Sequence, residues 1–134
     1  MSSGMTKIID TALSALRTEA KRIEVSAGNI ANLRSPGVRE GTSTPGGFQP
    51  KFVVQSTRPG GGITSRVVPR DPASLLVYSP SSSEADADGL VAVPNINLEQ
   101  EFITQIMARR AYEASAKLIK SEEERLRFLG DLLA

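Results

Sequence analysis

The sequence predicts a mainly α-helical fold, in which two long helices near the ends of the chain pair as a coiled coil, with a small irregular β insert between them. Two observations carry this prediction. Apolar side chains recur at helical spacing over residues 6–33 and 98–129, whereas Pro and Gly crowd the segment between them. The chain is therefore divided into an N-terminal coiled-coil helix (1–35), a Pro- and Gly-rich β insert (36–93) and a C-terminal coiled-coil helix (94–134).

The first helix carries a narrow apolar seam. Its members alternate at spacings of four and three, which is the pattern of a coiled coil: Ile9, Leu13, Leu16, Ala20, Ile23, Ala27 and Ile30. Pro36 must end this helix, because the residue before a proline is pushed away from the helical region, and Gly37 completes a turn.

The middle of the chain predicts short strands separated by turns. β-Prone runs occur at 52–55, 63–68 and 75–78, with a last short run at 90–93. We expect the first three to form a small sheet or ribbon on the side of the helices.

The last helix is the longest element that the sequence predicts. Asn97 is suited to cap its N-terminus, and Gln100 stands at the capping-box position. Residues at helical spacing form an apolar stripe on one face, and the adjacent Phe102 is assigned to the same packing surface: Ile103, Met107, Ala111, Ala114 and Leu118. Thirty-two helical residues span about 48 Å, whereas a compact domain of this size is about 36 Å across. The stripe must therefore lie against another long helix, in this chain or in a neighbour.

Composition excludes several kinds of site. The chain has no Cys and no His, which removes disulfides, thiol nucleophiles, most zinc sites and the commonest general base. We therefore expect no enzyme activity, no cofactor and no metal. No apolar run is long enough to span a membrane, and the N-terminus lacks the pattern of a signal peptide. We expect the chain to stay in the cytoplasm or to leave by a route that cleaves no signal.

Three motifs have an ordinary interpretation that is favoured over a functional one. Asp86 and Asp88 are similar to the start of a calcium loop, but the further oxygen ligands are missing, so an acidic turn is favoured. Glu99 and Glu101 could be the paired carboxylates of a hydrolase acting on the cell wall, but residues two apart on a helix point in different directions. The basic residues of the insert could bind nucleic acid, but they are dispersed, which favours a solvated surface.

Two polar segments are less easily explained. Asn29 and Asn32 stand just before the end of the first helix, although Asn is a poor helix former. A C-terminal cap in the left-handed conformation would explain Asn32 but not Asn29. In the last helix, small residues allow close helix approach, while Arg110 and Tyr112 offer hydrogen-bond donors.

These segments contribute to a resemblance that covers both ends of the chain. The first stretch reads Ala-Leu-Ser-Ala at 12–15 and Gly-Asn-Ile-Ala-Asn-Leu-Arg-Ser-Pro-Gly at 28–37. The second reads Asp-Ala-Asp-Gly-Leu-Val at 86–91, Pro-Asn-Ile-Asn at 94–97, then Glu101, and Arg-Ala-Tyr-Glu-Ala at 110–114. In this order they resemble the N- and C-terminal signatures of the bacterial flagellar rod and hook proteins. The acidic turn, the Pro-Asn-x-Asn step and the short length resemble the proximal-rod type, FlgC.

The resemblance implies a structural subunit of the flagellar basal-body rod. Such a subunit is exported uncleaved by the flagellar type III apparatus and assembles helically with copies of itself and other rod proteins into the proximal rod in the periplasm, where it transmits torque for motility. Neither nucleic acid nor a membrane span is expected. Residues assigned on this basis to the helix ends and to subunit packing are Asn29, Asn32, Pro36, Gly37, Asn95, Asn97, Arg110 and Tyr112. The alternatives are another rod or hook subunit, or a small nucleic-acid-binding module that uses the basic insert.

Overall fold

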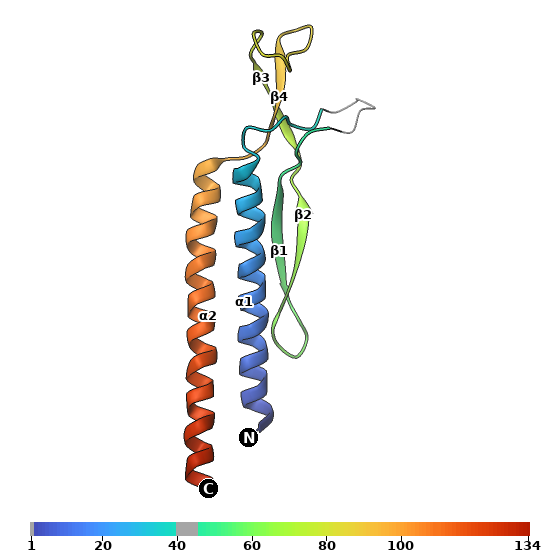
Figure 1. Ribbon diagram of the computed structural model, residues 1–134. Helices are drawn as coiled ribbons and strands as arrows, with labels where there is room; N and C mark the ends of the chain where they lie inside the picture. The colour runs from blue at the N-terminus through green and yellow to red at the C-terminus, as the bar shows by residue number, and fades with distance from the viewer. Residues whose placement is uncertain (1, 40–45) are drawn as a thin grey trace.

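The computed structural model describes residues 2–39 and 46–134 of the chain (Figure 1). Two long helices enclose a β insert in the sequence, as predicted. The elements in chain order are α1 (Ser2–Ala31), β1 (Lys51–Thr57), β2 (Ile63–Pro69), β3 (Ser74–Tyr78), β4 (Leu90–Pro94) and α2 (Leu98–Leu133).

The two helices lie side by side and run in opposite directions (Figure 1). α1 is the central element, because it contacts α2 on one side and the β1–β2 hairpin on the other. One long side of α2 consequently remains open.

The start of α2 follows the predicted cap. The Asn97 side-chain oxygen accepts a hydrogen bond from the Gln100 backbone nitrogen at 3.0 Å, and acidic residues occupy the first turn. The helix then continues through Gly130 to Leu133, within the predicted C-terminal segment 94–134. Its 36 residues span about 54 Å.

The insert forms two separate antiparallel hairpins instead of one sheet. β1 pairs with β2, from Lys51 opposite Pro69 to Thr57 opposite Ile63, and this hairpin runs along α1. β3 pairs with β4, from Ser74 opposite Pro94 to Tyr78 opposite Leu90, and projects beyond the ends of the helices (Figure 1).

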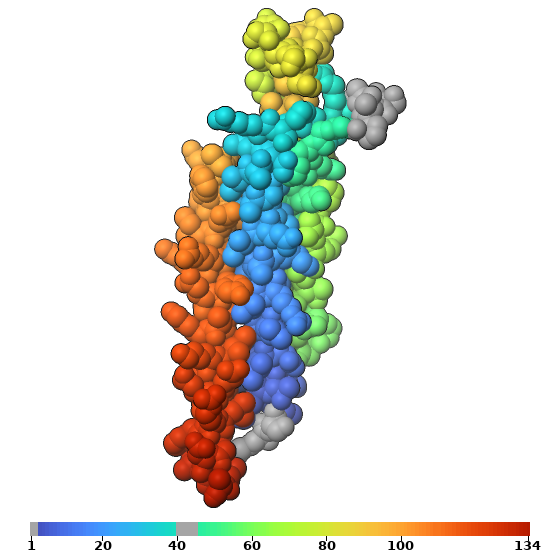
Figure 2. Space-filling model, in the orientation of Figure 1, coloured from blue at the N-terminus to red at the C-terminus, as the bar shows by residue number. Residues whose placement is uncertain are grey.

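The molecule is elongated (Figure 2), and its apolar core is small. Among the described residues, the buried hydrophobic side chains are only Ala12, Val53, Ala92 and Ala108. The chain exposes 9399 Å², whereas a compact protein of 14.3 kDa exposes about 6800 Å². The fold therefore leaves an unusually large surface open to partners.

Candidate assembly site: a buried polar junction and an uncovered helix face

Asn29 is the centre of a polar junction where α1, β1 and α2 meet. Its side chain is almost fully buried, and its amide nitrogen donates to the Lys51 backbone oxygen at 2.8 Å. Its amide oxygen accepts from the Lys51 backbone nitrogen at 3.1 Å. Asn29 thus satisfies both backbone groups of the first residue of β1, which fixes the hairpin against the helix.

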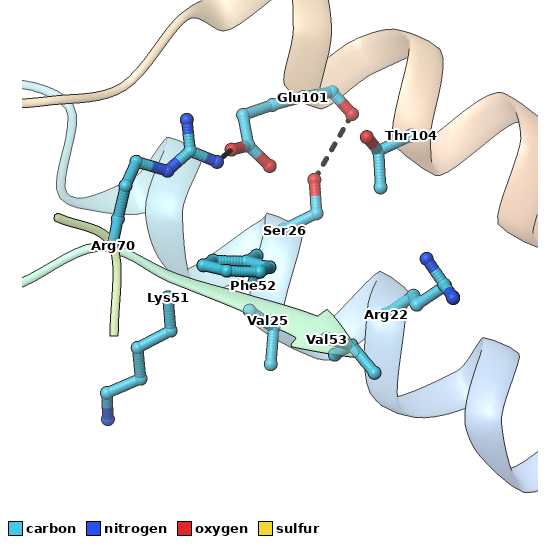
Figure 3. Close-up of a pocket in the computed structure, with 9 residues that line it drawn as sticks. All are labelled: Arg22, Val25, Ser26, Lys51, Phe52, Val53, Arg70, Glu101 and Thr104. Carbon is cyan, nitrogen blue, oxygen red and sulfur yellow. Dashed lines mark hydrogen bonds and ion pairs between the residues drawn. The ribbon is translucent and has the colours of Figure 1, made fainter. Parts of the chain in front are cut away.

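Glu101 joins the junction from α2 (Figure 3). Glu101 is buried, with 4% of the residue exposed. Its Oε1 accepts hydrogen bonds from the Asn29 amide at 3.1 Å and from the Arg70 guanidinium at 3.2 Å. The Ser26 hydroxyl donates to the Glu101 backbone oxygen at 3.1 Å. A buried carboxylate is tolerated when it is paired and hydrogen-bonded in this way. Glu101 belongs to the C-terminal signature, but the sequence does not predict its burial or its partners Arg70 and Ser26.

A small cavity of about 160 Å³ adjoins the junction. Figure 3 shows the Arg70 and Glu101 side chains directed toward one another on one side of it, and the Ser26 hydroxyl directed to α2. Because Ser26 and Glu101 are engaged in these bonds, their role here is structural: they hold α1 and α2 together. Glu99, the other member of the imagined carboxylate pair, lies exposed.

The end of α1 is fastened by side chains and not by a left-handed residue. The Asn32 amide donates to the Gly28 backbone oxygen at 2.9 Å, and its side-chain oxygen accepts from the Ser35 hydroxyl at 3.0 Å. Within residues 2–39 and 46–134, positive φ angles occur only at glycines, so the left-handed cap proposed for Asn32 is wrong. The side-chain bonds supply the cap instead.

Pro36 and Gly37 connect α1 to the base of both hairpins. The Pro36 backbone oxygen accepts from the Phe48 nitrogen at 2.7 Å, and the Gly37 nitrogen donates to the Ala92 oxygen at 2.9 Å. A Cβ on Gly37 would lie 2.7 Å from the Val93 carbonyl carbon, so only glycine allows this close approach.

The two asparagines of the Pro-Asn-x-Asn step have separate structural tasks. Asn97 caps α2, as described above. Asn95 closes the β3–β4 hairpin, because its backbone nitrogen donates to the Ala73 oxygen at 2.9 Å and its side-chain amide donates to the Pro72 oxygen at 2.8 Å.

The acidic turn before β4 is stabilised by hydrogen bonds to the Asp86 carboxylate. The Asp86 carboxylate accepts from the backbone nitrogens of Leu90 and Asp88 at 2.9 Å each and from the Arg39 guanidinium at 3.0 Å. The hydrogen bond from Leu90, followed by those from Arg39 and Asp88, holds the pKa of Asp86 below its usual value. The part of the chain that the structure describes contains no cluster of acidic residues suited to a metal ion.

The basic insert is partly neutralised within the chain. Arg39 pairs with Asp86, and Arg70 pairs with Glu101. Of the six basic residues in positions 34–70, two are therefore engaged by acidic partners. In the described ranges, no helix is both long and apolar enough to cross a membrane.

The predicted seam of α1 is only partly covered. Five of its residues are half-buried, namely Ile9, Leu13, Leu16, Ile23 and Ile30. Ala20 and Ala27 are exposed. The side chains that α1 buries fully are instead small or polar: Ala12, Thr18, Ser26 and Asn29.

Most of the predicted stripe of α2 lies exposed. Met107 is 66% exposed, Ile103 and Leu118 are about half exposed, and Ala114 is exposed too, whereas Ala111 is half-buried. The other predicted packing residues of α2 that lie exposed are Phe102, Arg110 and Tyr112.

Ala108 is the buried apolar side chain of α2, and Ile23 of α1 and Ile106 of α2 line a groove between the helices. The two helices do pair, but a coiled coil formed by the two predicted stripes is not confirmed. The predicted stripe does not include Ile106, which is 54% exposed beside Met107. Its spacing of three and four residues from its exposed neighbours could have revealed it. We name the exposed set formed by Phe102, Ile103, Ile106, Met107 and Leu118 the α2 stripe.

Comparison with known proteins places these features in a family. A family profile described as flagellar basal body rod FlgEFG protein C-terminal matches residues 87–132, which contain the end of the acidic turn, β4 and most of α2. The flagellar basal-body rod protein FlgC of Yersinia enterocolitica is 34% identical over 120 residues, covering 85% of this chain and 87% of the relative. The FlgC protein of Salmonella typhimurium is 32% identical over the same shares. That of Borreliella burgdorferi is 30% identical, covering 92% of this chain and 94% of the relative. The chain belongs to the FlgC-type family of flagellar basal-body rod proteins.

Proposed function

We propose that this protein is a non-catalytic structural subunit of the proximal rod, and that it assembles helically through α1 and α2 with copies of itself and with other rod proteins. The observation that carries the proposal is the uncovered α2 stripe. Five large apolar side chains of α2 remain 45–66% exposed, although α1 packs against the same helix. A soluble monomer rarely leaves such a face open.

The surface area supports the same conclusion. The chain exposes about 2600 Å² more than a compact protein of its mass, and a standard interface covers about 800 Å² of each partner. The excess is enough for contacts with several neighbours, which a subunit inside a helical assembly requires.

The position in the cell forms part of the proposal. The subunit leaves the cytoplasm through the flagellar type III export apparatus without cleavage, and takes its place in the section of the rod that crosses the periplasm. There the paired helices and the hairpin fixed to them transmit torque to the parts beyond. The mass of the protein in isolated basal bodies should therefore equal its mass in the cytoplasm.

A gene deletion with complementation tests the structural role. Cells without the gene should not swim, and electron microscopy should show basal bodies that lack a rod. The natural sequence should restore both properties. Met107→Asp should not, because it places a charge in the α2 stripe, whereas the control Met107→Leu keeps the same position apolar and should complement. Swimming cells with intact rods after deletion would refute the proposal.

A further inference from the structure

The β3–β4 hairpin presents apolar side chains that its own chain does not cover. The four consecutive residues from Leu75 to Tyr78 in β3 are 47–72% exposed. Among the described elements, this hairpin contacts no helix and neither strand of the other hairpin. β3 contains neither a charge nor a proline that would protect its edge. Because an isolated two-stranded hairpin is marginal in water, this one requires a cover from another molecule.

The charged residues of the β3–β4 hairpin are all acidic. The segment from Ser74 to Pro94 contains Glu84, Asp86 and Asp88 and no basic residue. Asp86 pairs with Arg39. The exposed carboxylates of Glu84 and Asp88 form no ion pair with any described residue. Two uncompensated negative charges therefore accompany the apolar strand.

The β1–β2 hairpin carries the opposite charge. Residues 46–70 contain no acidic residue and four basic ones: Lys51, Arg58, Arg66 and Arg70. Arg70 pairs with Glu101, whereas the other three are exposed and form no ion pair within the described part of the chain. Asp71, directly after the hairpin, offsets only one of these three charges. α1, on which the hairpin packs, contains four basic and three acidic residues and so does not reverse the sign.

The β1–β2 hairpin also offers apolar surface beside its basic residues. Phe52 and Val67 are each 41% exposed. Val53 is buried where the hairpin packs on α1, and its neighbour Val54 lies opposite Arg66. Because successive residues of a strand point to opposite faces, Arg66 belongs to the face directed away from α1. We call this face the outer face of the β1–β2 hairpin.

We infer that the β3–β4 hairpin of one copy of this chain packs on the outer face of the β1–β2 hairpin of a second copy. An acidic hairpin with exposed apolar side chains then meets a basic hairpin with exposed apolar side chains, and the opposite charges select which surfaces pair. The inference rests on the proposed assembly into a rod, and it adds a second contact to the one made by the α2 stripe.

The shape of the molecule allows this contact between copies that point the same way. β1–β2 lies alongside α1, whereas β3–β4 projects beyond the end of the helices, so the two hairpins are displaced from one another along the long axis (Figures 1 and 2). A second copy in the same orientation, displaced along this axis, brings its β1–β2 hairpin beside the β3–β4 hairpin of the first. The contact is heterologous, so each copy keeps one free hairpin and the series continues.

Cysteine cross-linking tests the contact, since the chain has no cysteine of its own. Two differently tagged copies are expressed together in the deletion strain, one with Leu76→Cys in β3 and the other with Thr64→Cys, which shares the outer face of β2 with Arg66. Basal bodies are isolated and treated with a short bis-maleimide, and a dimer carrying both tags is expected. The matched control replaces Thr64→Cys by Ser121→Cys, an exposed position on α2, and should give no such dimer.

Charge reversal tests why the two hairpins pair. Arg66→Glu in the copy with the β2 cysteine should remove most of the double-tagged dimer, because it places a like charge opposite Glu84 and Asp88. Asp88→Arg in the other copy should restore the dimer. Arg127→Glu, which reverses an exposed basic residue of α2, is the control and should leave the yield unchanged. A yield that does not respond to Arg66→Glu would overturn the role of charge in the contact.

The outcomes separate this contact from the general role. Rods that assemble and support swimming but give no double-tagged dimer overturn the contact and leave the structural role intact. A cross-link from either cysteine to a protein of different mass shows that another subunit occupies the surface, which overturns the assignment to a second copy. If the first cysteine pair blocks assembly, Tyr78→Cys with Ser56→Cys, which lies opposite Thr64 on β1, takes its place and is judged in the same way.

Discussion

The amide nitrogen of Asn29 lies 3.1 Å from the carboxylate of Glu101, although 72 residues separate them in the sequence. The same Asn29 side chain also bonds both backbone groups of Lys51. One buried residue therefore ties together the two helices and the first hairpin.

Asn29→Ala should destabilise the protein strongly. It leaves the backbone groups of Lys51 and part of the Glu101 carboxylate without partners, and each buried polar group left unsatisfied costs about 1–3 kcal/mol. The free energy of unfolding, measured in urea, should fall by the sum of several such costs. Asn32→Ala is the control, because it removes only bonds around the end of α1 and should cost about 1 kcal/mol. Equal losses in the two variants would contradict the central position of Asn29.

The Arg70–Glu101 pair should behave as a coupled unit. Arg70→Met leaves a buried carboxylate uncompensated and should cost about 3 kcal/mol of unfolding free energy. Combining it with Glu101→Gln removes the charge and should recover part of that loss. A double-mutant cycle measures the coupling, and additive losses would show that the two side chains act independently.

Replacing Gly37 and Gly28 by alanine should change the stability of the protein in opposite directions. Gly37→Ala brings a methyl group to 2.7 Å from the Val93 carbonyl carbon and should cost about 1–3 kcal/mol. Gly28→Ala meets nothing within 4 Å, lies inside α1, and should raise the stability by up to about 1 kcal/mol. Thermal unfolding of the two variants in parallel checks both signs.

Asp86 should make the acidic turn sensitive to acid. Its pKa is lowered in the folded state, so its contribution to stability is complete above the unfolded value of about 3.9 and is lost as the pH falls through the lower folded value. The stability difference between the natural chain and Asp86→Asn should therefore be constant near neutral pH and shrink below about pH 4. Titration of the carboxyl group by NMR checks the direction of the shift, and a pKa at or above the usual value would contradict it.

Ile23→Asp tests the seam of α1. Ile23 is half-buried and lines a groove with Ile106 of α2, so the variant places an unpaired charge where the two helices meet. We expect it to abolish rod assembly in a deletion strain and to lower the stability of the isolated chain. Met107→Asp should block assembly while it changes the monomer's stability by no more than about 0.5 kcal/mol, because Met107 is exposed. Rods built from Ile23→Asp would show that the seam is assigned wrongly.

The local elements could be predicted from the sequence because their signals are local. The Asn97 cap, the strand runs around Val53 and Val77, and the two long helices each depend on neighbouring residues. The face of α2 that meets α1 could not be predicted in the same way. The spacing of apolar residues identifies a stripe but does not tell which partner covers it. The buried residues of the helix pair include small ones such as Ser26 and Ala108, which hydropathy patterns do not single out.

The contacts of the polar junction could not be predicted from the sequence, for a different reason. Asn29 stood out because Asn is a poor helix former, but nothing in the sequence linked it to Glu101 or Arg70. These contacts join segments that are far apart in the chain, and they depend on the path that the insert takes between the helices. The division of the insert into two hairpins, one beside α1 and one beyond it, has the same origin.

The location of Glu101 has a mechanical consequence. The residue lies in the first turn of α2, and the helix continues to Leu133 over a further length of about 48 Å. A force applied near Leu133 therefore reaches the junction along this whole length, over most of which α1 lies beside α2. Neighbouring molecules that hold the far end of α2 would share this load, so stiffness under load would be a property of the packed array and not of the single chain.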